Sequence, residues 1–123
     1  MTGHVLSDDD KAKVRADFRD AVNMTPAELR RWLDTEDSRS VGMTQGGERV
    51  SGPGGKEAVG HHMGYEILAL HDLHQDRYGE AEYDTMRKVT GYVHRHTAQR
   101  PHGDVTDSRW RQSLMNWGHD PLK

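Results

Sequence analysis

Cysteine is absent from the 123 residues of this chain. Its absence excludes disulfide bridges, zinc sites built on thiolates and cysteine nucleophiles. Apolar residues are also scarce, at 33% of the chain, and the mean hydropathy is -0.99. Globular proteins usually approach about half apolar residues when glycine is counted. We therefore expect one folded domain with a thin core and long loops.

Long hydrophobic runs are missing as well. The longest apolar stretch surrounds residues 67–70 and falls far short of the roughly 18 residues that a membrane helix needs. The first ten residues are acidic, where a secretory signal would be basic and then apolar. The sequence therefore predicts a cytoplasmic protein without a membrane partner.

Positive charge is scarce over most of the chain and gathers near its C-terminal end. Residues 1–86 hold 10 basic and 17 acidic side chains, whereas residues 87–112 hold six basic and two acidic ones. The formal net charge of the whole chain is -3, which argues against indiscriminate binding of nucleic acids. A basic patch on an acidic body can still bind a polyanion locally, although uneven charge also arises without function.

Helical periodicity recurs along the chain, and no run of alternating β-branched residues is present. Apolar spacing and capping signals predict about five helices, over residues 8–22, 26–34, 56–73, 80–98 and from about 105 to 117. The last helix would begin at a cap on Asp104 or Thr106 and end at Gly118. Its apolar stripe of two tryptophans and a leucine should be buried. We assign residues 1–123 to one all-α domain, with residues 1–7 flexible.

Glycine is dense in one segment. Seven of the 13 glycines fall within residues 42–60, a density that neither a helix nor a strand tolerates. We expect a long glycine-rich loop over residues 42–56, with a small hairpin inside it as the alternative. The segment lacks most of a Walker A phosphate loop, but its glycine amides and Lys56, just ahead of a helix, could hold one phosphate. A flexible linker explains the same composition.

Nine histidines raise the question of a metal site. His71 and His74 are three residues apart on a predicted helix and could face one ion. The local sequence fixes no third ligand, so we expect no metal site and no cofactor. No serine or acid pair stands in a setting typical of catalysis. The sequence therefore predicts a protein that is not an enzyme.

The predicted nucleic-acid contacts lie mainly on the last two helices. Lys88 and Arg95 are seven residues apart and share one helix face, with Gly91 between them. A glycine inside a helix costs about 1 kcal/mol relative to alanine, which favours close approach of another helix or of a phosphate backbone. The full set of predicted contacts is Lys88, Arg95, Arg100, Arg109, Arg111, Gln112, Asn116, Lys56 and Arg49.

Two amides in this set are candidates for reading bases. Gln112 and Asn116 are predicted on the side of the last helix opposite the tryptophan stripe, where such side chains can recognise adenine edges. A solvated polar face on a packing helix explains the same pattern. The two helices joined by residues 99–103 are similar to a helix-turn-helix motif, but the turn is longer than its usual 3–4 residues.

Several runs of the sequence resemble a known family. They are residues 22–25, 28–29, 32–33, 86–89, 91–96, 99–101, 110–111 and 113–123. Together they resemble, over about residues 15–123, the small bacterial and fungal family catalogued as domain of unknown function 3140. Its members are loosely labelled "DNA-binding protein", so the resemblance implies DNA binding and supplies no site residues.

We therefore expect a small helical DNA-binding or nucleoid-associated protein that contacts phosphates through residues 87–111. The glycine-rich loop, with Arg49 and Lys56, would be a second contact. Binding to DNA should be weak and largely tolerant of sequence, unless a homodimer doubles the basic patch. Two alternatives stay open: a protein-interaction or stress-associated module that binds no nucleic acid, and a histidine-dependent metal-binding protein.

Overall fold

The computed structural model describes residues 7–41 and 59–123. Within these ranges the chain forms helices and no strand. The helices are α1 (Asp8–Ala21), α2 (Pro26–Leu33), α3 (Glu36–Val41), α4 (Val59–Asp72), α5 (Glu80–Thr97) and α6 (Arg109–Asn116), with a 3-10 turn at Gln75–Arg77. The predicted all-α class is confirmed.

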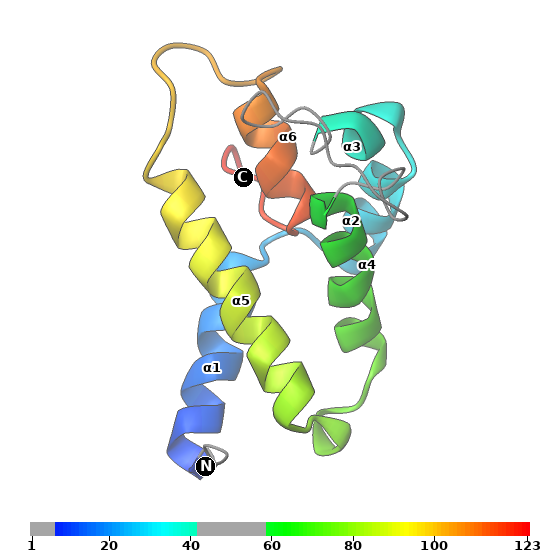
Figure 1. Ribbon diagram of the computed structural model, residues 1–123, viewed down its shortest axis with the longest axis vertical. Coiled ribbons are helices and arrows are strands. Elements are labelled where there is room, and N and C mark those ends of the chain that lie inside the picture. The colour runs from blue at the N-terminus through cyan, green and yellow to red at the C-terminus, as the bar shows by residue number, and fades with distance from the viewer. Residues whose placement is uncertain (1–6, 42–58) are drawn as a thin grey trace.

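Helices α2, α3, α4 and α5 pack against α6. Figure 1 shows α4 and α5 as two flanks of the molecule, joined at one end by the 3-10 turn, with α6 between their other ends. The first helix packs along α5, while α2 packs on α4 and α3 packs on α6. As a result, α6 has neighbours on several sides, and its Trp110, Leu114 and Trp117 are 8%, 0% and 5% exposed. The predicted burial of this stripe is confirmed.

The first two helices begin as the sequence predicts. The hydroxyl of Thr25 accepts a hydrogen bond from the amide of Glu28 (3.1 Å), and the Glu28 carboxylate accepts one from the amide of Thr25 (2.8 Å). Ser7 and Asp10 form the same reciprocal pair at the start of α1. Each of these reciprocal pairs is a capping box, which satisfies two backbone donors that the helix leaves unpaired.

The start of the last helix differs from the prediction. Its cap is Ser108, whose hydroxyl accepts from the amide of Arg111 (3.1 Å). Asp104 instead accepts from the amide (2.9 Å) and hydroxyl (2.6 Å) of Thr106 and closes a local turn. The expected cap at Asp104 or Thr106 is therefore wrong, because a nearer serine completes the first helical turn.

Two glycines are required by the packing. A Cβ on Gly64 would lie 2.4 Å from Leu33 Cδ2 and 2.9 Å from the carbonyl oxygen of Asn116, so α4 approaches α2 and α6 closely there. Gly118 has a φ of +80°, a conformation that costs most other residues about 1–2 kcal/mol. Since the amide of His119 donates to the carbonyl of Leu114 (3.0 Å), α6 ends in a Schellman motif. The predicted stop at Gly118 is confirmed.

Some predictions fall outside the described residues. These are the glycine-rich loop over residues 42–56, its hairpin alternative, Arg49, Lys56 and the flexibility of residues 1–6. Ser7, the last residue of the segment expected to be flexible, caps α1. In the part of the chain that the structure describes, no helix is long and apolar enough to span a membrane.

Candidate nucleic-acid interface

One side of α5 carries the central pair of predicted contacts. Its buried residues, Met86, Val89 and Val93 among them, turn Lys88, Gly91 and Arg95 outward; we call these three residues the α5 face. Lys88 and Arg95 are both exposed, and neither forms an ion pair with any described residue. Two helical turns separate them, about 10.5 Å along the axis at 1.5 Å per residue.

No helix of the described chain packs on Gly91. Beyond the local helix backbone, a Cβ built there would meet only the guanidinium end of Arg95, with Nη1 at 3.1 Å. The predicted approach of another helix is therefore not found among the described residues. The arginine side chain folds back along the helix and holds its charge above the glycine.

Carboxylates border the α5 face on one side. Arg87 is paired with Asp84 on the same helix. An open groove of about 480 Å³ runs between α1 and α5, lined by Asp10, Lys13, Val14, Asp17, Arg87, Thr90 and Gly91. Of its α1 charges, Lys13 is paired with Asp17 at 2.9 Å. A phosphate would be repelled by Asp10 and Asp17, so the side of the α5 face away from α1 suits an anion better.

Two further predicted cations lie near the loop that joins α5 to α6. The guanidinium of Arg100 lies 5.4 Å from the centre of the Trp110 ring, and Arg109 is the exposed first residue of α6. Neither forms an ion pair among the described residues. The loop also carries Asp104, and hydrogen bonds from Thr106 lower the pKa of this carboxyl. A charged carboxylate therefore lies in the same α5–α6 connection as Arg100.

Arg111 has a structural role. Its Nε donates to Asp120 Oδ1 (3.0 Å), its Nη2 to Asp120 Oδ2 (2.9 Å) and its Nη1 to the carbonyl of Thr106 (2.9 Å). The hydrogen bonds from Arg111 lower the pKa of Asp120, and those to Asp120 raise the pKa of Arg111. The expected phosphate contact at Arg111 needs correction, because Asp120 neutralises its charge and three of its five N–H groups donate within the protein.

Asn116 lies in the core. It is 1% exposed, and its Oδ1 accepts hydrogen bonds from Trp32 Nε1 (2.7 Å) and from the hydroxyl of Ser38. Its Nδ2 donates to the carbonyl of Ser38 (3.0 Å). The expectation that Asn116 faces solvent and reads bases is therefore wrong. Gln112 is half-buried, and its side chain makes no hydrogen bond with any described residue.

The hydroxyl of Ser38 also lies 3.0 Å from His61 Nδ1. Trp32 Nε1 can only donate a hydrogen bond, so the Asn116 atom that it contacts is the amide oxygen, Oδ1. This oxygen can only accept, and it therefore also accepts the proton of the Ser38 hydroxyl. The serine oxygen then accepts from His61, which places a proton on Nδ1. Ser38 is 0% exposed. The histidine is therefore a donor to this serine, and the pair lacks the base that a catalytic serine needs.

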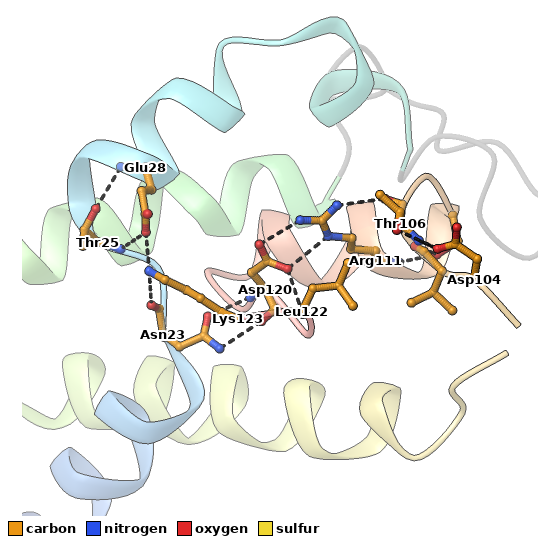
Figure 2. Close-up of polar contacts among 11 residues, drawn as sticks. Asn23, Thr25, Glu28, Asp104, Thr106, Arg111, Asp120, Leu122 and Lys123 are labelled. Atoms are coloured by element: carbon orange, nitrogen blue, oxygen red, sulfur yellow. Dashed lines mark hydrogen bonds and ion pairs between the residues drawn. The ribbon is translucent and has the colours of Figure 1, made fainter. Parts of the chain in front are cut away.

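Residues from four of the sequence runs that resemble the family form a hydrogen-bonded network at the C-terminus (Figure 2). The amide of Asp120 donates to Asn23 Oδ1 (2.7 Å), and Asn23 Nδ2 donates to the carbonyl of Asp120 (3.0 Å). Lys123 Nζ donates to the carbonyl of Asn23 (2.9 Å) and to Glu28 Oε1 (2.5 Å). Together with Arg111, these residues join the end of the chain to α6 and to the α1–α2 connection. Their roles within the described structure are therefore architectural.

His71 and His74 belong to no metal-binding group among the described residues. His74 Nδ1 accepts from the amide of Asp76 (3.2 Å) and caps the 3-10 turn. The ring of His71 lies 6.4 Å from that of Phe18, and partial burial lowers its pKa. Within residues 7–41 and 59–123, no three histidine, aspartate or glutamate side chains are placed to hold a metal ion.

Sequence reasoning missed an aromatic stack between α5 and α6. Tyr92 stacks on Trp117 with ring centres 4.1 Å apart and on His96 at 5.1 Å, and His96 stacks on Trp110 at 6.3 Å. Arg100 covers the outer end of this stack. The spacing of Tyr92 and His96, one helical turn apart, is the signal from which part of it could have been found.

Comparisons with known proteins give one match. A family model described as "Protein of unknown function (DUF3140)" matches residues 17–115, most of the chain. A search of curated proteins and a search of solved structures found nothing that matches. The family expected from the sequence is confirmed, and its description names neither a ligand nor a reaction.

Proposed function

We propose that this chain, which belongs to the DUF3140 family of proteins of unknown function, is a small DNA-binding protein that contacts phosphates through the α5 face. The observation that carries the proposal is the state of Lys88 and Arg95, which are exposed, aligned and without ion pairs among the described residues. Such cations can neutralise phosphates without first losing a carboxylate partner. The proposed activity is binding and involves no catalysis.

Gly91 supports the same proposal. No described helix uses the space that its missing side chain leaves, although a glycine inside a helix costs stability. The guanidinium of Arg95 lies over the glycine, so a phosphate that approaches α5 there meets this charge, from the side away from the α1 carboxylates. Lys88 and Arg95 are separated by about 10.5 Å along the helix axis, and duplex DNA carries one charge per ~1.7 Å of axis, so both side chains can contact phosphates of one duplex.

The proposal keeps Arg100, Arg109 and Gln112 as flanking contacts and leaves out Arg111 and Asn116. Arg49 and Lys56 stay predictions outside the described residues. Binding should be weak, because few cations contribute and because the net charge of the chain is -3. It should also tolerate most sequences, since phosphate contacts carry no base information.

Fluorescence anisotropy with a labelled DNA duplex at low salt tests the proposal. The double variant Lys88→Ala/Arg95→Ala should bind roughly tenfold more weakly or worse, because each charge-assisted hydrogen bond contributes up to about 1.5–3 kcal/mol. The matched control is Arg19→Ala/Arg77→Ala. It removes two exposed cations that also form no ion pair among the described residues.

Only a loss specific to the α5 face supports the proposal. If both double variants lost the same affinity for the duplex, the loss would come from the change in net charge and not from the α5 face. Failure of the wild-type protein to bind the duplex even at low salt would contradict DNA binding and favour the protein-interaction alternative.

A further inference from the structure

A second surface lies on the flank of the molecule formed by α2 and α4. An open groove of about 360 Å³ is lined there by Ala27, Arg30, Arg31, Asp34 and Tyr65. Ala27, Arg30 and Arg31 share the outward side of α2 and Asp34 is its C-cap, while Leu29 and Leu33 on the other side of the helix are fully buried. Figure 1 shows α4 and α5 on different flanks, and the groove shares no residue with the α5 face.

Tyr65 is the aromatic part of this surface. It is 45% exposed, and within the described chain only Leu122 is an equally exposed large hydrophobic residue. Its ring stands nearly perpendicular to that of buried His61, with centres 5.1 Å apart and an angle of 83°. Its hydroxyl makes no hydrogen bond with any described residue. The contact with a buried neighbour orients the tyrosine, and much of its surface stays available.

The groove is positively charged. Arg30 and Arg31 are exposed and form no ion pair with a described residue. The carboxylate that lines the groove, Asp34, is paired with Arg39 at 3.1 Å. On α4, Glu66 next to the tyrosine lies 3.5 Å from the imidazole of His62. An exposed aromatic ring therefore stands beside two guanidinium groups whose charge is not neutralised.

We infer that this groove binds an unpaired nucleotide of single-stranded DNA. The base stacks on Tyr65 and the adjoining phosphates contact Arg30 and Arg31. Sequence-tolerant binding of single strands commonly combines a basic track with aromatic side chains, because every base has a π-face. The volume of the groove is at the small end of the range for ligand pockets, roughly 300–1,000 Å³, which suits one nucleotide.

The inference rests on the proposed function, since both concern DNA. It adds a second class of ligand, single-stranded DNA, on a separate surface. Bases inside a duplex are stacked on each other and cannot cover a tyrosine ring without being flipped out. The groove should therefore distinguish single strands from duplexes, whereas the α5 face contacts the backbone that both share.

The test measures fluorescence anisotropy with two probes, a labelled oligo-dT strand and a labelled duplex. Tyr65→Ala should weaken binding of the single strand by roughly 5- to 150-fold, the effect typical of losing one stacked base. Tyr65→Phe keeps the ring and should stay within about twofold of the wild type. The variant Arg30→Ala/Arg31→Ala should also weaken single-strand binding, and none of these variants should change duplex binding.

Leu122→Ala is the matched control, because it removes an equally exposed apolar side chain elsewhere and should leave single-strand binding unchanged. An unchanged affinity of Tyr65→Ala for oligo-dT overturns the inference. The proposed function is then judged separately, from the duplex titration of Lys88→Ala/Arg95→Ala. If that variant alone loses single-strand binding, single strands use the α5 face and the groove has no part. Failure of the wild type to bind either probe contradicts both proposals.

Discussion

Replacing Asn116 tests the assignment of this residue to the core. Asn116→Ala removes two hydrogen bonds to Ser38, which is 0% exposed, and one to Trp32, which is partly exposed. Because Ser38 is fully buried, water cannot replace the lost partner of its hydroxyl and carbonyl. Each buried polar group that loses its partner costs about 1–3 kcal/mol, so with two such groups the variant should lose about 2–6 kcal/mol of unfolding free energy. That loss is a large part of the roughly 5–15 kcal/mol of a typical domain.

Urea denaturation followed by tryptophan fluorescence measures this loss. The matched control is Gln112→Ala on the same helix, whose side chain has no hydrogen-bond partner among the described residues. It should change the unfolding free energy by no more than about 0.5 kcal/mol. If the two variants are equally stable, Asn116 is not a buried residue whose hydrogen bonds to Ser38 and Trp32 stabilise the core. Its place among residues that face DNA would then be restored.

Other predictions concern packing and pH. Gly91→Ala should stabilise the protein by about 0.5–1 kcal/mol in urea denaturation, whereas Gly64→Ala should destabilise it by at least about 1–3 kcal/mol, because its Cβ would overlap Leu33. Burial lowers the pKa of His96, so its unfolded form binds a proton more readily. Stability should therefore fall as the pH drops below about 6.5, and His96→Phe should reduce this dependence. The arginine partner lowers the pKa of Asp120, so its contribution is present at neutral pH and is lost as the pH falls below about 3.8 towards the folded-state value. Asp120→Asn should cost about 2 kcal/mol at pH 7 and little at pH 2, as measured by urea denaturation at both pH values.

Most helices could be predicted because their signals are local. The capping pair of Thr25 and Glu28 and the apolar stripe of α5 each lie within one stretch of chain. The helix α3 was missed because it has only six residues and no periodic pattern. Two of those residues, Ser38 and Val41, are 0% and 1% exposed in a helix that packs against α6. Its stability therefore depends on tertiary contacts that the sequence pattern does not show.

The candidate site also has residues that local sequence signals could predict and residues that they could not. The exposure of Lys88 and Arg95 follows from their spacing opposite the buried residues of α5. Asn116 was misplaced because a helix with one apolar stripe is expected to have one buried side, whereas α6 is covered on several. The partners that bury it, Trp32 and Ser38, are 84 and 78 residues away in the sequence. The partner of Arg111 lies nine residues later, beyond a turn whose direction helical spacing does not give.

The salt dependence of duplex binding tests the central claim most directly. Each neutralised phosphate contributes about -0.9 to the slope of log affinity against log salt concentration, so Lys88, Arg95, Arg100 and Arg109 together predict a slope of about -3.6. Lys88→Ala and Arg95→Ala should each make the slope less steep by about 0.9, and Arg19→Ala should leave it unchanged. A slope near zero, or one that neither α5 variant alters, would contradict phosphate binding by the α5 face.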